Sequence, residues 1–266
     1  MDVEQWSSLA TRVLAPNPGS MTLDGTNTYV VRAPGSSAVI VDPGPEISAH
    51  LDRIEALGPV ELILLTHHHS DHAESIDAMV ARTGAPVRAA DATLCRGAEP
   101  LRDGEMIRAG ETRIAVLATP GHTIDSLCFH LPEDGAAGAD APVGSILTGD
   151  TILGSGTTVL TQPDGALRDY IRSLERLRSL PDSTIVLPAH GPSLPSLAVV
   201  AGRYLGHRRM RLAQVREALA ELDVDASVEP EVVARVTDIV YPQIDPAIRF
   251  AAEASTAAQL EYLADA

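Results

Sequence analysis

The stretch Thr66–His72, read as Thr-His-His-His-Ser-Asp-His, constrains this chain more than any other part of it. Its H-x-H-x-D-H spacing follows directly after an apolar run at residues 62–65. Imidazole nitrogen and carboxylate oxygen are the ligands that zinc, manganese and iron accept most readily. A solvated polar loop would not follow a buried-strand pattern and open a helix at Asp-His. The stretch therefore predicts a metal site at the end of a buried strand.

The rest of the pattern predicts an α/β fold. Strand and helix signals alternate from residue 27 onward, which is the signature of strands and helices packed in layers. We expect strands at 27–31, 38–41, 61–65, 86–89, 106–108, 112–117, 127–130, 145–148 and 184–188, with helices near 47–57, 76–83 and 166–180. Residues 132–142 predict a surface loop. Beyond Pro195 the pattern is helical, so we predict a catalytic domain at 1–198 and a helical domain at 199–266.

Further ligand-type residues follow other predicted strands. His122, Asp150 and His190 each stand where an apolar strand stops at Gly, Pro or Thr. Together with the residues of the first cluster they make seven candidates: His67, His69, Asp71, His72, His122, Asp150 and His190. Seven is too many for one tetrahedral metal. The number suits two metals that share one carboxylate and keep positions open for water and substrate. Asp42 also ends a strand, which fits a turn former or a residue that supports the site from behind.

Composition removes several kinds of chemistry. All 20 basic residues are Arg, so lysine-dependent phosphate loops, Schiff bases and Ser-Lys hydrolysis are excluded. The net charge of −16 argues against a large polyanion-binding surface. No apolar run approaches the ~20 residues that span a bilayer, and the acidic N-terminus is unlike a secretory signal. We expect a cytoplasmic protein.

The whole set of motifs resembles the metallo-β-lactamase superfamily. H-x-H-x-D-H, a lone His after Pro-Gly, Gly-Asp and a final Ala-His-Gly occur in the family's order between residues 27 and 192. The resemblance implies an αββα sandwich, a first metal on His67, His69 and His122, and a second on Asp71, His72 and His190. It also implies that Asp150 bridges the two metals, that Asp42 lies behind the site, and that His68 is no ligand. The two divalent ions are expected to be zinc, although iron and manganese fit the same ligands.

The C-terminal part resembles one branch of this superfamily. Residues 17–29 and the arginine-rich segment 203–216 are similar to the branch of β-lactamase-like protein 2 and the fungal polyketide thioesterases. That branch carries a small winged-helix-like domain, which residues 204–266 could form. Arg208 falls inside an apolar helical stripe, so it should either pair with a carboxylate at the domain interface or, with His207, bind an anionic substrate.

Three functions follow from these observations. The first is a metal-dependent hydrolase that uses a metal-bound hydroxide, oriented by Asp71, on a small ester or thioester. The second is a single-strand-specific endoribonuclease, which the branch and the Arg cluster favour but which 3% aromatic residues leave with little for base stacking. The third is a non-catalytic nucleic-acid or protein adaptor, which the complete ligand set disfavours. Oligomeric state has no signature in the sequence.

Overall fold

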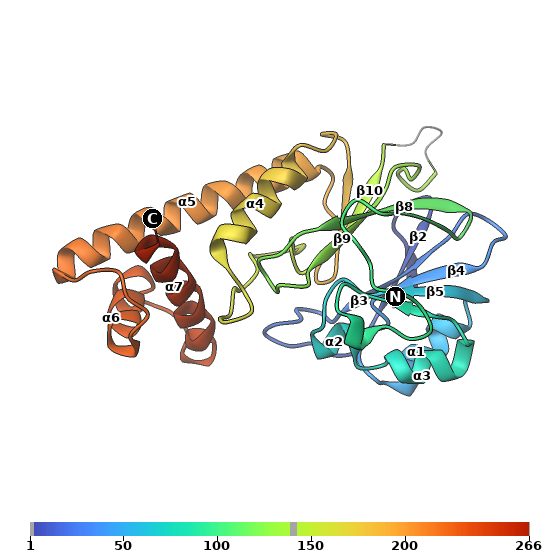
Figure 1. Ribbon diagram of the computed structural model, residues 1–266, viewed down its shortest axis with the longest axis horizontal. Coiled ribbons are helices and arrows are strands. Elements are labelled where there is room, and N and C mark those ends of the chain that lie inside the picture. Colours follow the sequence, from blue (N-terminus) through green and yellow to red (C-terminus); the bar gives the residue numbers. More distant parts are fainter. Residues whose placement is uncertain (1–2, 139–142, 266) are drawn as a thin grey trace.

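Two β-sheets packed face to face form the centre of the computed structural model, which describes residues 3–138 and 143–265 (Figure 1). The first sheet has six strands in the order β1-β2-β3-β4-β5-β6. Its neighbours from β1 to β4 are antiparallel, whereas β4, β5 and β6 run parallel. The strands are β1 (Val3–Gln5), β2 (Ala10–Leu14), β3 (Asn27–Val31), β4 (Ala38–Val41), β5 (Val60–Leu64) and β6 (Val87–Arg88).

The second sheet has five strands in the order β11-β10-β9-β8-β7. Only β10 and β11 run parallel, and the other neighbours are antiparallel. The strands are β7 (Met106–Ala109), β8 (Thr112–Ala118), β9 (Leu127–Leu131), β10 (Ser145–Gly149) and β11 (Ile185–Pro188). Every strand predicted from residue 27 onward is therefore present, with no end shifted by more than one residue.

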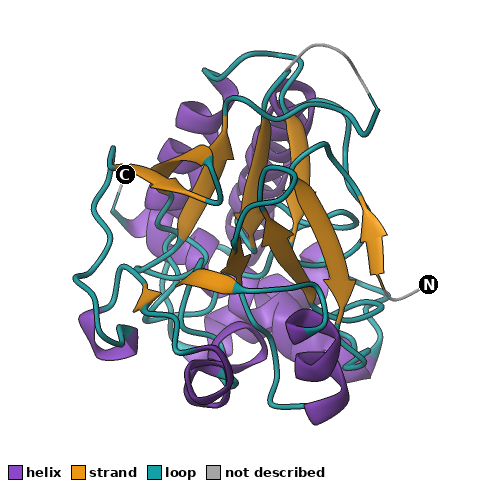
Figure 2. Ribbon diagram, turned by 90° about the vertical axis from the view of Figure 1, so that its right-hand side faces the viewer, coloured by secondary structure: helices purple, strands orange, loops and turns teal. Residues whose placement is uncertain are grey.

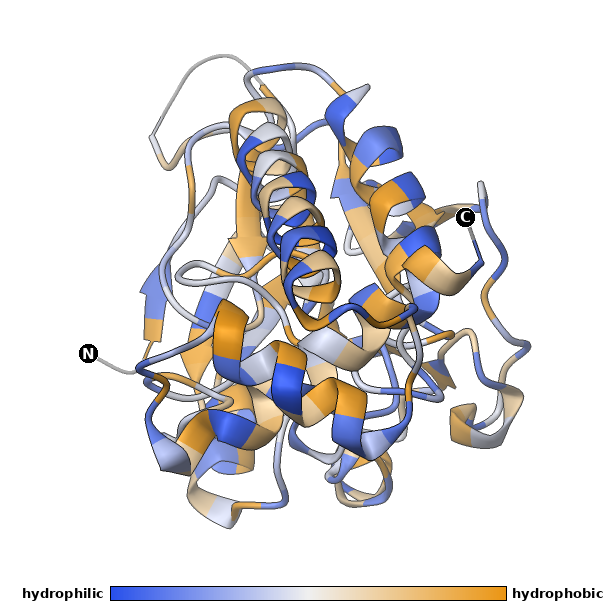
Figure 3. Cartoon of the chain, turned by 90° about the vertical axis from the view of Figure 1, so that its left-hand side faces the viewer, coloured by the Kyte–Doolittle hydropathy of each residue, from blue (hydrophilic) through white to orange (hydrophobic). Residues whose placement is uncertain are grey.

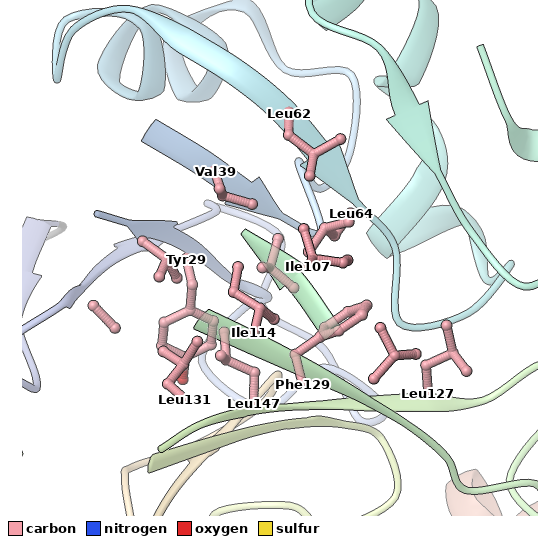
Figure 4. Packing of buried hydrophobic residues seen from close by; sticks show 14 of the residues in the cluster. Tyr29, Val39, Leu62, Leu64, Ile107, Ile114, Leu127, Phe129, Leu131 and Leu147 are labelled. Atoms are coloured by element: carbon pink, nitrogen blue, oxygen red, sulfur yellow. The ribbon is translucent and has the colours of Figure 1, made fainter. Parts of the chain in front are cut away.

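The central core lies between the two sheets. Figure 4 shows Tyr29, Val39 and Leu64 of the first sheet facing Ile114 and Phe129 of the second. Each of these side chains is at most 2% exposed. Removing a fully buried Phe ring from such a core costs about 3–5 kcal/mol. This contact fixes the two sheets relative to each other, and with them the strand ends that carry the site.

Helices cover the outer face of each sheet, as Figure 2 shows. On the first sheet, Leu51, Ile54 and Met79 pack against Ile40 and Ile63. On the second sheet, a separate cluster joins the strands to the two helices that follow them. The helices are α1 (Ser48–Glu55), α2 (Ser70–Ala73), α3 (Ile76–Thr83), α4 (Leu167–Arg178) and α5 (Leu197–Leu222), with a 3₁₀ turn η1 at Ala92–Leu94. The order helix, sheet, sheet, helix confirms the predicted αββα sandwich.

The chain ends in helices, as predicted. These are α5, α6 (Pro230–Val240) and α7 (Arg249–Ala264), with a 3₁₀ turn η2 at Pro246–Ile248. Apolar and polar residues alternate around them (Figure 3), and their apolar faces meet in a cluster that includes Val215, Val236 and Leu260. No strand occurs among the described residues 199–265, so the winged-helix-like form is not confirmed. The division at 198/199 falls in the first turn of α5 and stays a prediction.

The N-terminal segment departs from expectation. β1 and β2 join the edge of the first sheet, although their mixed polar composition gave no strand signal.

The loop predicted at 132–142 is anchored rather than fully exposed, because Asp134 is completely buried and accepts hydrogen bonds from Ser8 and Leu9. Residues 139–142 of that loop lie outside the described residues.

None of the helices in residues 3–138 and 143–265 combines the length and the apolar character needed to cross a membrane.

Candidate metal centre

The seven predicted ligands come together at one edge of the sandwich. The loops after β5, β8, β10 and β11 deliver them, and α2 starts within the first cluster. All the ligand imidazoles except His69 are at least nine-tenths buried. These seven side chains divide into two sets whose ligand atoms lie within 4.8 Å of one another. One comprises His67, His69, His122 and Asp150, and the other Asp71, His72 and His190.

Three imidazole nitrogens converge in what we call the three-imidazole group, His67, His69 and His122. His67 Nε2 and His122 Nε2 each lie 3.1 Å from His69 Nδ1. Ligand nitrogens around one tetrahedral zinc lie about 3.3 Å apart, because each Zn–N bond is about 2.0–2.1 Å long. The three nitrogens therefore already have the spacing of a shared cation.

Asp71, His72 and His190 form a second cluster, which we call the acidic group. Asp71 Oδ2 lies 3.3 Å from His72 Nε2 and 3.3 Å from His190 Nε2. The same carboxylate oxygen accepts a hydrogen bond of 3.0 Å from the Thr26 hydroxyl, which fixes its direction. The His72 and His190 side chains are at most 1% exposed, whereas that of Asp71 is 26% exposed.

Asp150 lies between the two groups. Its Oδ1 faces the acidic group, 3.3 Å from His190 Nε2 and 3.7 Å from His72 Nε2. Its Oδ2 faces the three-imidazole group, 3.6 Å from His122 Nε2. Both Asp150 Oδ1 and His72 Nε2 are buried without a hydrogen-bond partner among the described residues. Buried polar atoms left without a partner are costly, so this donor set fits a pair of bound cations.

The outward nitrogens of four rings are held from behind. His72 Nδ1 contacts Asp42 Oδ2 at 2.9 Å, and His67 Nδ1 contacts the Thr66 hydroxyl at 3.0 Å. His122 Nδ1 lies 2.9 Å from the Val159 carbonyl oxygen, and His190 Nδ1 lies 3.1 Å from the Gly25 carbonyl oxygen. Donation of each Nδ1–H to these acceptors leaves the Nε2 lone pair facing the centre. His69 is the exception, because its Nδ1 faces the centre.

Two backbone positions let the strands end where the ligands must lie. Asp42 adopts a left-handed conformation, with φ of 53°, and its carboxylate accepts from the Thr66 amide and hydroxyl at 2.8 and 2.7 Å. This places Asp42 behind the site, where the family resemblance put it. Gly149 has φ of 49°, and a Cβ on it would lie 2.7 Å from the Thr66 side chain. Only glycine fits both constraints just before Asp150.

Charge and burial shift the pKa values of the two groups in opposite directions. Burial and the neighbouring rings lower the pKa of His67, and burial with His122 lowers the pKa of His69 to about 4. Burial also disfavours charge on His72, but Asp71 and Asp42 outweigh it and raise the His72 pKa. Asp71 itself has its pKa lowered, because His72 and His190 outweigh its burial. The acidic group thus favours positive charge, as a cation site does.

Sequence reasoning did not single out Thr66 and Thr26, which orient His67 and Asp71. Thr66 stands directly before the first His of the motif, and this position is the signal from which a supporting hydroxyl could have been predicted. Thr26 is itself held by Asn17, whose side-chain amide lies 2.9 Å from the Thr26 hydroxyl. Both Thr26 and Asn17 lie in the stretch used only for the family resemblance. The backbone carbonyls of Gly25 and Val159 leave no signal in a sequence.

His68 points away from both groups. Its Nδ1 lies 2.9 Å from Asp125, its Nε2 lies 3.5 Å from Asp164, and its side chain is 41% exposed. His68, His69 and Asp164 form a third set of neighbouring ligand atoms. That set shares His69, whose Nδ1 already faces the three-imidazole group.

Arg208 is buried, but the prediction that it pairs with a carboxylate is wrong. The side chain is 3% exposed, and no carboxylate in residues 3–138 and 143–265 forms an ion pair with it. Its Nη2 instead donates to the Thr158 carbonyl oxygen at 2.6 Å, and its guanidinium lies 4.9 Å from the ring centre of Tyr170. Arg208 and His207 both line a cavity beside the loop 157–159.

Comparison with known proteins agrees with this arrangement. The family model described as "Metallo-beta-lactamase superfamily" matches residues 21–190. A beta-lactamase-like protein 2 homolog of Caenorhabditis elegans is 30% identical, and the match covers 94% of this chain and 82% of that protein. An atrochrysone carboxyl ACP thioesterase of Paecilomyces divaricatus is also 30% identical, with coverage of 93% and 77%.

Solved structures extend the likeness to the whole fold. A metallo-beta-lactamase family protein of Thermus thermophilus superposes with a TM-score of 0.73 at 23% identity, covering 96% of this chain and 92% of that one. A protein solved in a di-iron-bound form is 27% identical with a TM-score of 0.57, covering 72% of this chain and 98% of that one. By sequence, sheet order and matched family model, the chain belongs to the metallo-beta-lactamase superfamily of hydrolases.

Proposed function

We propose that this protein is a binuclear metal-dependent hydrolase that cleaves a small thioester or ester. One observation carries the proposal: the two oxygens of Asp150 face two separate clusters of ligand atoms. In this proposal the three-imidazole group holds one cation, the acidic group holds the other, and Asp150 bridges them. Residues 1–198 form the catalytic domain and residues 199–266 the helical domain.

Zinc is the first choice for both cations, because a set of imidazoles and carboxylates with tetrahedral spacing suits it. The same ligands also accept iron and manganese, and one similar protein was solved with two iron ions. When bound, two such cations supply the Lewis acidity that ionises water at neutral pH and polarises a scissile carbonyl.

The residues of the chain position the reaction. Asp71 is the member of the acidic group that solvent reaches, since its side chain is 26% exposed. Its lowered pKa keeps the carboxylate ionised at neutral pH, so it accepts a hydrogen bond from the attacking water and orients it rather than storing its proton. The hydroxyl of Thr26, which donates to Asp71 Oδ2 at 3.0 Å, holds the carboxylate in this direction.

The substrate class rests on the relatives and on charge. One relative is named as a thioesterase acting on an acyl carrier protein substrate. A net charge of −16 repels a long polyanion, and aromatic residues make up only 3% of the chain, which disfavours the endoribonuclease alternative. An acyl thioester is neutral at the reacting carbonyl and is readily attacked by water.

The first test uses two neighbouring histidines. Zinc-loaded protein is assayed on an acyl thioester by release of free thiol, and on single-stranded RNA by cleavage. His69→Ala removes a nitrogen of the three-imidazole group itself. Loss of a residue that only supports a metal ligand costs up to roughly 100-fold in activity, so we expect thioester hydrolysis to fall by at least that factor. His68→Ala changes the adjacent exposed ring and should keep activity within about 2-fold, as surface changes usually do.

Metal content completes this test. Elemental analysis should give two metal ions per wild-type chain and a reduced content for His69→Ala. Equal activity in the two variants, or full activity after chelation, would remove the metal centre from the reaction. RNA cleavage lost in His69→Ala, without thioester hydrolysis, would replace the thioesterase with the endoribonuclease.

A further inference from the structure

A cavity of about 170 Å³ lies beside the metal centre, between the loop 157–159 and the C-terminal helices. The loop provides one wall, and α5 provides His207, Arg208 and Arg211. The segment from Tyr241 to Ser255 closes the other side. In Figure 1 the C-terminal helices stand beside the sandwich, with α5 running from one to the other.

Three nitrogen atoms of the α5 residues in this cavity are buried without a partner. They are His207 Nδ1, Arg208 Nε and Arg211 Nε, and none has a hydrogen-bond partner among the described residues. The Arg208 residue as a whole is only 3% exposed. An N–H group that is out of water and without an acceptor costs about 1–3 kcal/mol. The Nε–H groups of Arg208 and Arg211 therefore lack an acceptor in the described part of the chain.

No acidic residue in the described part of the chain lines this cavity, although the full sequence has 36 Asp and Glu residues against 20 Arg. Within the described part of the chain, neither Arg208 nor Arg211 has an ion pair with a carboxylate. Arg208 lies against the Tyr170 ring, and Arg211 lies 4.4 Å from the ring centre of Tyr241. Two guanidinium groups that are partly desolvated and lack a counter-ion make a site for an anion.

Most of the remaining lining is apolar, and Thr157, Thr158 and Ser255 are its hydroxyl-bearing residues. Val159, Ile244, Ile248 and Ala252 surround the charged floor, together with the Tyr241 ring. An inorganic ion would leave these side chains uncovered, whereas an organic anion with an apolar body would cover them. The composition of the walls thus selects an amphipathic ligand rather than a free ion.

The cavity and the metal centre share a wall. Thr158 offers its carbonyl oxygen to Arg208 Nη2 at 2.6 Å, and its hydroxyl lies 3.1 Å from His122 Nδ1. The next residue, Val159, accepts from the same His122 nitrogen. A ligand in this cavity would therefore lie one loop away from His122 of the metal centre.

We propose that this cavity binds the anionic group, carboxylate or phosphate, of an amphipathic acyl substrate through Arg208 and Arg211. The inference rests on the proposed hydrolase function and adds the substrate's charge to it. Arg211 supplies the more open guanidinium, and Arg208 both contacts the anion and ties the loop 157–159 to α5. The neutral part of the substrate then extends toward the metal centre.

Direct binding tests the cavity apart from catalysis. Calorimetry measures octanoate, octyl phosphate and neutral octanamide on zinc-loaded full-length protein. Arg211→Gln should weaken whichever anion binds by roughly 10-fold, the value of one charge-assisted hydrogen bond, and leave octanamide unchanged. Arg211→Lys should restore part of the affinity. Arg209→Gln is the matched control, because Arg209 lies on the same helix with its side chain 67% exposed.

Kinetics then show which part of the substrate carries the anionic group, the acyl chain or the thiol. Four thioesters combine an acyl chain with or without a terminal carboxylate and a thiol with or without a phosphate. Arg211→Gln should raise KM about 10-fold for the matching anionic thioester, with kcat kept, and leave the neutral thioester unaffected.

The outcomes separate the two proposals. Equal effects of Arg211→Gln and Arg209→Gln, or equal effects on anionic and neutral ligands, would overturn the anion site while leaving the hydrolase intact. Absence of thioester hydrolysis, with anion binding still lost in Arg211→Gln, would overturn the hydrolase proposal and keep the site. Anion binding that is unchanged in Arg211→Gln overturns the inference whatever the activity.

Discussion

The two halves of the candidate centre differ in what holds them. In the acidic group, His72 contacts the carboxylate of Asp42, the residue directly after β4 of the first sheet. In the three-imidazole group, His122 rests on the Val159 carbonyl oxygen, in a loop tied to α5 by Arg208. Only the acidic group therefore has a carboxylate directly behind one of its rings, whereas His122 of the three-imidazole group has a neutral support whose loop is tied to the C-terminal helices.

The difference has a physical consequence. A carboxylate behind an imidazole makes the ring a stronger ligand and favours positive charge in front of it, whereas a carbonyl mainly sets its direction. Asp42 also reaches the three-imidazole group, but only through the Thr66 hydroxyl, which contacts His67 Nδ1 at 3.0 Å. We therefore expect the two halves to bind their cations with different affinities and to respond differently to changes in their supports.

The largest effect should come from Asp42→Asn. The carboxylate accepts from the Thr66 amide, the Thr66 hydroxyl and His72, and an amide would set an N–H against one of these donors. Asn tolerates the left-handed φ of 53° at this position, so the backbone is preserved. We expect cobalt affinity at the acidic group to fall about 10- to 100-fold, with a smaller loss at the other group.

Stepwise cobalt titrations against a competing chelator measure this, with His190→Ala and His122→Ala assigning the two steps. Equal losses at both steps would show that Asp42 supports the two halves alike, and the contrast between them would be lost. An unchanged affinity at both steps would remove Asp42 from the centre.

The strand ends explain why so much of the site could be predicted. Each ligand follows an apolar strand, and strands that run in the same direction bring their carboxyl ends to one edge, so the positions of His67, His122, Asp150 and His190 after strands favoured their meeting. The helical end was predicted from a different signal, the helical spacing of apolar residues beyond Pro195, which form the apolar stripe of α5.

Apart from Asp42, the supports could not be predicted, because they depend on tertiary contacts rather than on residue type. The carbonyl of Val159 is common to every residue, and only the fold places it against His122. Arg208 was expected to pair with a carboxylate or a substrate, and the side chain found instead a backbone carbonyl and an aromatic ring. Asp134 was assigned to a surface loop, yet it is fully buried and accepts hydrogen bonds from the hydroxyls of Ser7, Ser8 and Ser145.

A second test uses the layer beneath Asp42. The Thr28 hydroxyl donates to the Asp42 carbonyl oxygen at 2.6 Å. Because its proton is used there, the hydroxyl accepts from His50 Nε2, which lies 3.0 Å away. His50 Nδ1 has no hydrogen-bond partner among the described residues. Burial, then Arg53, lowers the pKa of His50 to about 4. The unfolded chain binds a proton near pH 6.5, so it holds more protons than the folded chain between pH 6.5 and 4. Stability must fall as the pH falls through this window.

Between pH 7.5 and pH 5, this one residue should remove about 2 kcal/mol from the free energy of unfolding. His50→Gln keeps an N–H for Thr28 and cannot be protonated, so urea denaturation of this variant should lack that part of the loss. A wild-type loss matched in full by the variant would mean that the pKa of His50 is the same in the folded and unfolded states. The three-imidazole half has no such titrating support, since Val159 and Arg208 contribute a carbonyl and a permanent cation.

The smallest effect should come from Thr158→Val on the three-imidazole half. The substitution removes a hydroxyl 3.1 Å from His122 Nδ1 and keeps the Val159 carbonyl oxygen at 2.9 Å, which is the better acceptor for that N–H. Because the ring keeps a partner, we expect cobalt affinity at the three-imidazole group to change by less than about 3-fold, which is under 1 kcal/mol. The same stepwise titration measures it. A loss as large as that of Asp42→Asn would show that a neutral hydroxyl holds its ring as strongly as a buried carboxylate does, and the distinction between the two halves would then have to rest on their ligands alone.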